Sequence, residues 1–66
     1  MNKKLSGMDK EIYGIMRSYY MKRHTVISVR SIAREVGLYS SSSVQYHIEK
    51  LKDLGYLNEN REPVEF

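Results

Sequence analysis

A run of four serines, Ser40 to Ser43, is followed closely by Gln45 and Tyr46. These side chains carry hydroxyl and amide groups that donate and accept hydrogen bonds, but none of them is a strong acid, base or metal ligand. Serine-rich runs are often flexible linkers. Here the run stands between a glycine turn and an amphipathic segment, so it can instead be the first turn of a helix.

The core-facing residues after the serines recur at the i, i+3, i+4, i+7 spacing of a helix. They are Val44, His47, Ile48, Leu51 and Leu54. This pattern predicts a helix over about residues 40–54, with Ser40 as its N-cap and Gly55 as its stop. Ser42 with Gln45 forms a competing capping box two residues later, so the first residue of the helix stays open.

Two further helices are predicted upstream of this one. Ser6 and Asp9 fit a capping box at the start of the first, which continues to about Lys22. Ser28 is the expected N-cap of the second helix, and Gly37 is its left-handed C′ residue. The expected core faces are Met8, Ile12, Ile15, Met16 and Tyr19 in the first helix and Val29, Ile32, Ala33 and Val36 in the second. Two helices joined by a tight glycine turn are the outline of a helix-turn-helix.

The pattern changes after Gly55 to two short segments around a polar turn, which predicts a small β-hairpin. Pro63 would confine its strand to a sheet edge, because proline has no N–H to donate. Val26–Ile27 is a candidate third short strand. The expected fold class is therefore mainly α with a small β-hairpin, a three-helix winged helix-turn-helix that forms one domain over residues 1–66.

The composition excludes several classes of protein. The chain has 66 residues, which permits one domain and is too short for a large catalytic cleft unless the chain oligomerises. It has no cysteine, and its two histidines are too few and too far apart for a histidine metal site without several carboxylates. No apolar run is long enough to span a membrane, and the start lacks the apolar stretch of a secretory signal. We expect a cytoplasmic protein that is not an enzyme and has no cofactor, no metal and no membrane partner.

The formal net charge of +3 is unevenly distributed. Residues 1–34 carry eight basic and two acidic side chains, whereas residues 35–66 carry three basic and six acidic ones. A basic half favours a polyanionic partner, because counterions released from the polyanion drive such binding. The charge alone fits an ordinary solvated surface equally well.

The serine helix offers a face suited to DNA. With Val44, Ile48 and Leu51 facing inward, its outward stripe is Ser42, Gln45, Tyr46, Glu49 and Asp53. Small hydroxyl side chains in the first turn let a helix end enter the major groove closely, and glutamine can make a bidentate contact to adenine. The two acidic residues would repel DNA if the helix lay flat. We therefore expect only its N-terminal half to enter the groove.

Other side chains are candidates for contacts to the DNA backbone. Arg30 and Arg34 share one face of the second helix, roughly opposite its core positions. Further candidates are Lys3, Lys4 and Lys10 near the start of the chain, and Asn58, Asn60 and Arg61 at the hairpin tip. His47 lies at the edge of the core stripe, and we expect it to be a packed, hydrogen-bonded histidine rather than a base or ligand.

The stretch SVRSIAREVGLYSSSSVQYHIEKLKDLGYL, residues 28–57, resembles the N-terminal DNA-binding domain of the LexA repressor family. The resemblance includes the glycine turn, the serine-initiated recognition helix, the histidine-aliphatic pair and the glycine-aromatic entry to the wing, and it extends back to Leu5. It implies base contacts from Ser40, Ser42, Ser43, Gln45 and Tyr46, with backbone contacts from the wing.

The sequence also departs from the family. Some members carry acidic residues where this chain has Gln45 and Tyr46, which implies a different operator. The short wing ends at Phe66, and nothing resembles the C-terminal self-cleaving peptidase and dimerisation domain. Self-cleavage is therefore not carried over to this chain.

The leading hypothesis is a sequence-specific duplex-DNA-binding transcriptional regulator, a repressor that binds its operator as a homodimer reading two half-sites. The alternative is a protein-interaction module, such as an antirepressor that acts on another regulatory protein. The six tyrosines of the chain favour this alternative, because tyrosine is enriched at protein–protein interfaces. An enzyme has little support, since no nucleophile–base pair or phosphate loop is present.

Overall fold

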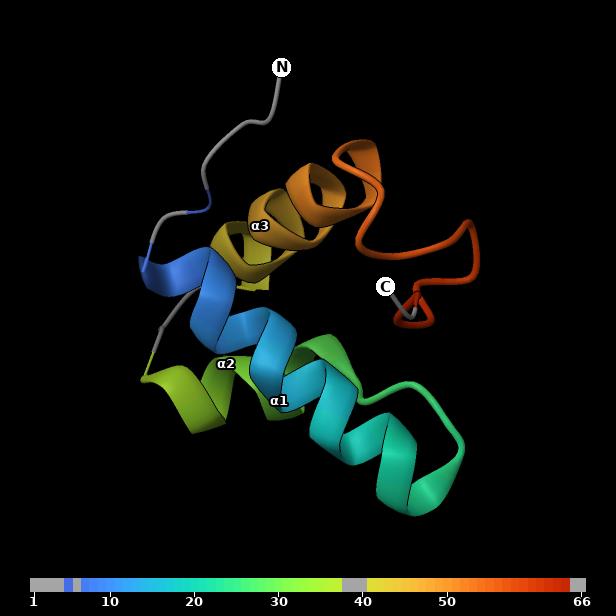
Figure 1. Cartoon of the computed structure of the whole chain (residues 1–66). Helices are drawn as coiled ribbons and strands as arrows, with labels where there is room; N and C mark the ends of the chain where they lie inside the picture. The colour runs from blue at the N-terminus through green and yellow to red at the C-terminus, as the bar shows by residue number, and fades with distance from the viewer. Residues whose placement is uncertain (1–4, 6, 38–40, 65–66) are drawn as a thin grey trace.

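A computed structural model describes residue 5, residues 7–37 and residues 41–64. It contains three helices, α1 (Gly7–Arg23), α2 (Val29–Val36) and α3 (Ser41–Asp53). Each helix contacts the other two, and α1 crosses in front of the α2–α3 pair in the view of Figure 1. The three predicted helices are therefore confirmed.

Both ends of α2 carry the predicted caps. The Ser28 hydroxyl accepts a hydrogen bond from the Ser31 N–H at 3.2 Å, and the Ser28 backbone is extended, as at an N-cap. Gly37 has a φ of 77°, and its N–H donates to the Ala33 carbonyl. This is the single-bond left-handed cap, which favours glycine because a Cβ is strained at positive φ.

Helix α3 begins at Ser41 and ends at Asp53. The later start with Ser42 as cap is wrong, because Ser42 lies within the helix; Ser40, the first-choice cap, lies outside the described residues. At the other end the Gly55 N–H donates to the Lys52 carbonyl at 3.1 Å, and the Tyr56 N–H donates to the Leu51 carbonyl at 2.9 Å. This pair of bonds is a Schellman motif, with the predicted glycine at its left-handed position.

The core lies where the three helices meet. Its buried residues are Ile12, Met16, Ile27, Ile32, Ala33, Val44, Ile48, Leu51 and Leu57. Most of the predicted core positions of the three helices point into it, with Met8, Ile15, Tyr19, Val29 and Val36 packed at its edge. The exception is Leu54, which follows the end of α3 and does not pack against this core. Ile27 and Leu57 enter from the segments between and after the helices.

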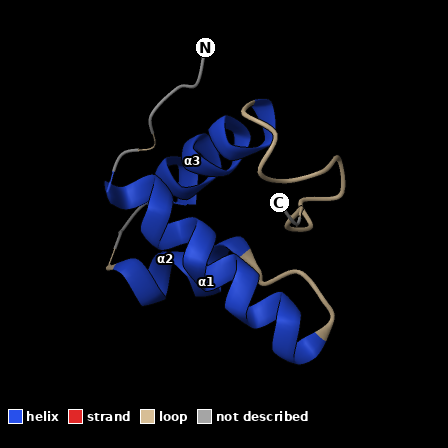
Figure 2. Ribbon diagram, in the orientation of Figure 1, coloured by secondary structure: helices blue, strands red, loops and turns tan. Residues whose placement is uncertain are grey.

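The predicted β-hairpin does not appear as strands in the described part of the chain (Figure 2). After α3 a single antiparallel bridge pairs Leu57 with Pro63. Hydrogen bonds flank this pair, from the Asn58 N–H to the Glu62 carbonyl at 2.9 Å and from the Val64 N–H to the Tyr56 carbonyl at 3.0 Å. Leu57 and Pro63 do not hydrogen-bond to each other, as in the non-hydrogen-bonded pairs of an antiparallel ladder. Proline, which has no N–H, is therefore tolerated at this position.

The turn between the two bridged residues is closed by side-chain and backbone hydrogen bonds of Asn58. The Asn58 side-chain oxygen accepts from the backbone N–H groups of Asn60 and Glu62, at 2.8 and 3.0 Å. Arg61 has a φ of 65°, which is outside the extended region. Val26 and Ile27, the candidate third strand, form no strand either. The segment is held to the helices instead by Tyr13, whose hydroxyl donates to the Val64 carbonyl at 3.2 Å.

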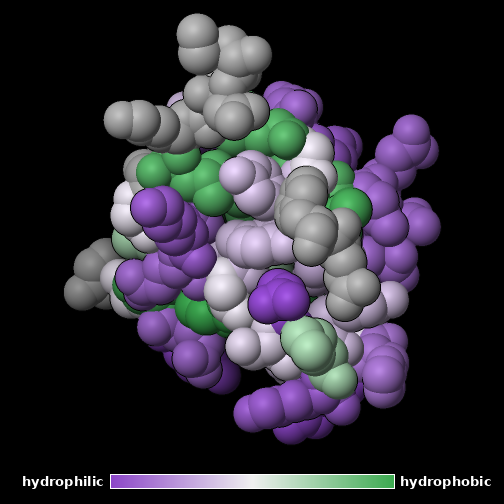
Figure 3. All heavy atoms as spheres, in the orientation of Figure 1, coloured by the Kyte–Doolittle hydropathy of each residue, from purple (hydrophilic) through white to green (hydrophobic). Residues whose placement is uncertain are grey.

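The surface is largely polar. On the face shown in Figure 3, hydrophilic side chains dominate the periphery, and the hydrophobic surface is broken into separate patches. Among the described residues, the exposed large hydrophobic side chains are Met21 and Tyr46. None of the described helices has the length and apolar character needed to cross a membrane.

Candidate nucleic-acid interface

One side of α3 is packed and the other is exposed. Val44, Ile48 and Leu51 are buried, as the helical spacing predicts. The exposed side of the N-terminal half consists of Ser42, Ser43, Gln45 and Tyr46, which we call the reading face. Tyr46 is 66% exposed. The reading face presents hydroxyl, amide and phenol groups, which can both donate and accept hydrogen bonds.

One flank of α3, next to the reading face, is tied to α1 by a buried carboxylate. Asp9 has no exposed surface. Its Oδ1 lies 2.6 Å from Nδ1 of His47, and its Oδ2 lies 2.7 Å from Nζ of Lys50. A carboxylate accepts hydrogen bonds, so the His47 contact places the hydrogen on Nδ1. His47 is thus the packed, hydrogen-bonded histidine that was predicted.

The contact with Asp9 alters the acidity of Lys50. The hydrogen bond to the Asp9 carboxylate raises the pKa of Lys50 above its ordinary value of 10.5. Partial burial opposes this rise, and the charges of Asp9 and Tyr46 add to it. Lys50 therefore stays charged throughout the neutral range.

The contacts of Asp9 with His47 and Lys50 were missed by sequence reasoning. The sequence pattern predicts a capping box between Asp9 and Ser6. Ser6 lies outside the described residues. A usable signal was present, since His47 and Lys50 stand three residues apart and so share one side of a helix. The spacing alone did not reveal which residue of α1 would face them.

Glu49 has cationic neighbours that bear on the expected repulsion of DNA. Its Oε1 lies 3.6 Å from Nζ of Lys52, and its Oε2 lies 4.0 Å from Nη2 of Arg61. Exposed pairs of this kind are weak, but they offset part of the negative charge below the reading face. The Glu49–Arg61 pair also links α3 to the turn at residues 58–62.

The predicted backbone-contacting residues are spread over the chain, with Lys10 exposed on α1. Arg30 and Arg34 are exposed on α2, the helix packed against α3. Asn58 and Asn60 are exposed in the turn after α3, although the Asn58 side chain also donates to Glu62 Oε1 at 3.0 Å. Lys3 and Lys4, like Ser40 among the base-contacting residues, lie outside the described part of the chain.

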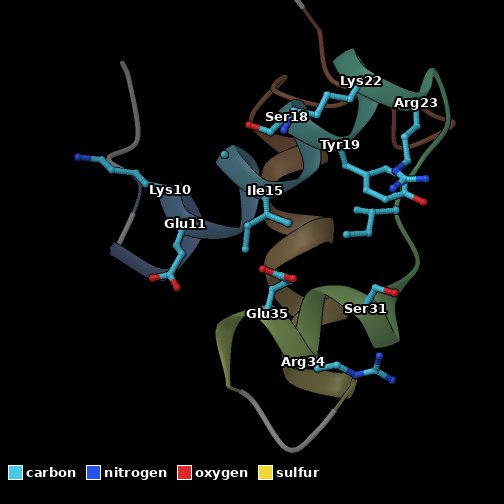
Figure 4. Close-up of a pocket in the computed structure, with 12 residues that line it drawn as sticks. Lys10, Glu11, Ile15, Ser18, Tyr19, Lys22, Arg23, Ser31, Arg34 and Glu35 are labelled. Atoms are coloured by element: carbon cyan, nitrogen blue, oxygen red, sulfur yellow. The ribbon is translucent and has the colours of Figure 1, made fainter.

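A hollow of about 760 Å³ separates α1 from α2 (Figure 4). Its charged lining residues carry both signs and are Lys10, Glu11, Lys22, Arg23, Arg34 and Glu35. Arg23 stacks over the Tyr19 ring, 5.4 Å from its centroid. Arg34 extends away from α1 in Figure 4, so its guanidinium remains accessible. No residue of the reading face lines this hollow.

Metal chemistry has no visible basis in the described part of the chain. No group of three or more histidine, cysteine, aspartate or glutamate side chains is placed there to hold a metal ion.

Comparison with known proteins places this arrangement in a family. The sequence model of the LexA DNA binding domain matches residues 2–63, nearly the full length of the chain. The chain belongs to the LexA DNA-binding domain family. The matched range includes all three helices and the whole reading face, which confirms the resemblance seen in the sequence.

Individual relatives agree with the family model. The chain is 42% identical over 57 residues to the LexA repressor of Alkaliphilus oremlandii, covering 86% of this chain and 28% of that protein. It is 42% identical over 53 residues to the LexA repressor of Corynebacterium jeikeium, covering 80% of this chain and 20% of that protein. It is 34% identical over 59 residues to the LexA repressor of Carboxydothermus hydrogenoformans, covering 89% of this chain and 29% of that protein. The chain thus spans less than a third of the length of these LexA repressors. No solved structure matches it significantly.

Proposed function

We propose that this chain is a sequence-specific duplex-DNA-binding transcriptional repressor. The observation that carries the proposal is the reading face, an uncharged hydrogen-bonding surface at the N-terminal half of α3 in a member of the LexA DNA-binding domain family. Groups of this kind recognise base edges in the major groove. The relatives are named LexA repressors, which supports repression as the sign of regulation.

The neighbouring elements suit contacts to the DNA backbone. Arg30 and Arg34 lie on α2, the helix that crosses the phosphates when a helix-turn-helix docks. The turn after α3 acts as a short wing, in which Asn60 is exposed and Arg61 reaches back to Glu49. These contacts set the register of α3 on the duplex, whereas the reading face supplies the sequence preference.

The experiment begins with selection of binders from a randomised duplex pool. The affinity of the selected duplex and of a scrambled duplex is then measured by fluorescence anisotropy over a salt series. Tyr46→Ala is expected to lower the preference for the selected duplex by about 1–3 kcal/mol, the usual contribution of one base contact. Arg34→Ala is expected to weaken both duplexes alike and to reduce the salt slope by about 1.

Arg23→Ala is the matched control, since it removes the same charge from the last turn of α1. Unlike Arg34→Ala, it should leave the affinity for both duplexes and the salt slope close to those of the wild type. Equal affinity of the wild-type protein for the selected and scrambled duplexes, fading together as salt rises, would show that only charge attracts it.

A specific observation favours a second function, binding of another protein. Met21 is 60% exposed beside a hollow of about 280 Å³ that Tyr20, Pro63 and Val64 also line. Exposed methionine and tyrosine side chains are enriched at protein interfaces. If this surface carries the function, Met21→Asp should abolish a complex with a second regulator and leave DNA affinity unchanged in the same anisotropy assay.

A further inference from the structure

The buried carboxylate of Asp9 has a role that helix packing alone does not require. We infer that Asp9 is a positioning residue for DNA reading: it holds α3 against α1 and, through His47, orients Tyr46 on the reading face. This inference rests on the proposed function, because it names a residue that sets the sequence preference of the same site.

The geometry restrains α3 at two points. Asp9 Oδ1 contacts His47 and Oδ2 contacts Lys50, at 2.6 and 2.7 Å. These two residues are three positions apart, so one carboxylate is joined to α3 at sites nearly one helical turn apart. Two such contacts oppose both rotation of α3 about its axis and sliding along it. Apolar packing is less directional and opposes these motions less sharply.

The second step leads from His47 to the reading face. The Tyr46 and His47 rings meet edge to face, with centroids 5.4 Å apart and planes at 75°. Tyr46 is 66% exposed, so the rest of the protein covers only a minor part of its surface. Asp9 holds the His47 ring through the hydrogen bond to Nδ1, and the His47 ring in turn contacts the Tyr46 ring.

Stability alone does not account for a buried charged group at this position. Replacing a buried ion pair by apolar side chains of similar volume is often neutral or stabilising. Leucine and methionine could therefore fill the places of Asp9 and Lys50 without loss of the fold. They would not reproduce the directional contacts.

The test is the double variant Asp9→Leu/Lys50→Met, which removes one negative and one positive charge and so leaves the net charge unchanged. We expect its affinity for a scrambled duplex to stay within about twofold of wild type, because non-specific binding follows charge. Its preference for the selected duplex should fall about tenfold, the scale of one lost base contact. A stable double variant with undiminished preference overturns the inference.

A second readout uses the protein without DNA. In wild type, nitrogen chemical shifts of His47 should show the hydrogen on Nδ1, and cross-relaxation should connect the His47 and Tyr46 rings. Both signals should weaken in the double variant. Their persistence also overturns the inference. If the wild-type protein shows no preference among duplexes, the proposed function fails, and this second readout alone decides whether Asp9 positions α3.

Three further variants complete the design. Lys50→Arg keeps the charge opposite Asp9 and should retain the preference. Glu11→Leu/Lys22→Met makes the same types of change at exposed positions of α1 and should leave both readouts unchanged. If the Asp9 double variant does not fold, His47→Asn replaces it. Asparagine can still donate to Asp9 but removes the ring that supports Tyr46, so an unchanged preference in this variant contradicts the inference.

Discussion

The residues of the reading face carry no charge, although charged residues surround them. The stretch from Ser41 to Ile48 contains no aspartate, glutamate, lysine or arginine. Attraction to a polyanion must therefore come from other residues, such as Arg30 and Arg34 on α2. Under the proposed function, the arginines would supply affinity and α3 selectivity, which is why Arg34→Ala and Tyr46→Ala are expected to change different properties.

At the same scale, the Asp9–Lys50 contact makes stability depend on pH in the alkaline range. The pKa of Lys50 is higher in the folded protein than its ordinary value of 10.5, mainly because of the hydrogen bond to Asp9. A group whose pKa rises on folding stabilises the protein fully below its unfolded pKa. That stabilisation is lost as the pH rises from the unfolded pKa through the folded one.

The measurement is the free energy of unfolding by urea, followed from about pH 9 to about pH 12, the range in which lysine and tyrosine titrate. The protein has six tyrosines, so the wild type is compared with Lys50→Arg, which keeps them all. Arginine stays charged throughout this range. The wild type should lose more stability than the variant as the pH rises. Parallel curves would show that the Lys50 pair contributes nothing.

At the scale of elements, two glycines end helices in a conformation that other residues rarely adopt. Gly37 and Gly55 have φ values of 77° and 90°. A Cβ added at either would meet nothing within 4 Å, so the cost of a side chain there comes from the backbone alone. Gly55→Ala should lower the free energy of unfolding by about 1–2 kcal/mol, the cost of a left-handed non-glycine residue.

Gly14 supplies the matched control, because it is an exposed residue within α1 that also has nothing within 4 Å of an added Cβ. Gly14→Ala should raise the free energy of unfolding by about 0.5–1 kcal/mol, since alanine favours the helix. Urea denaturation of the two variants measures both effects. A Gly55→Ala protein as stable as wild type would mean that the helix ends in some other geometry.

The elements that local chemistry determines were predictable from the sequence. Ser28 and Gly37 fix both ends of α2 through caps made within a few residues, and the helical spacing of the apolar residues located the core. The strands expected after Gly55 and at Val26–Ile27 do not form in the described part of the chain, so the local pattern was misleading there. A ladder forms only if its partners continue it, and here the Asn58 side chain and the left-handed Arg61 close the turn after one bridge.

The Asp9 site shows the same limit for long-range contacts. Asp9 and His47 are separated by 38 positions in the chain, so their contact depends on how α1 crosses α3. A carboxylate in a first helical turn fits a cap equally well. The packing of the helices, rather than any local preference of Asp9, determines its partners on α3.

At the scale of the whole molecule, size limits how DNA can be bound. The chain measures 32 × 24 × 18 Å, and a single module of this kind buries only about 600–1,000 Å² of protein surface on DNA. One copy is thus expected to bind weakly. Two copies on one face of the duplex would read half-sites about 34 Å apart, or a multiple of that distance. The longest dimension of the chain is no greater than this spacing, so two copies can fit on one face of the duplex without overlapping.

We therefore expect selection to yield an inverted repeat whose half-site centres are separated by about one helical turn or a multiple of it. Inserting five base pairs between the half-sites rotates them to opposite faces of the duplex. This change should reduce the affinity for the second copy to that of an isolated half-site. Sedimentation of the protein with each duplex gives the number of copies bound. Two copies with the same affinity at both spacings would mean that they bind independently, so the chain would act on DNA as a monomer.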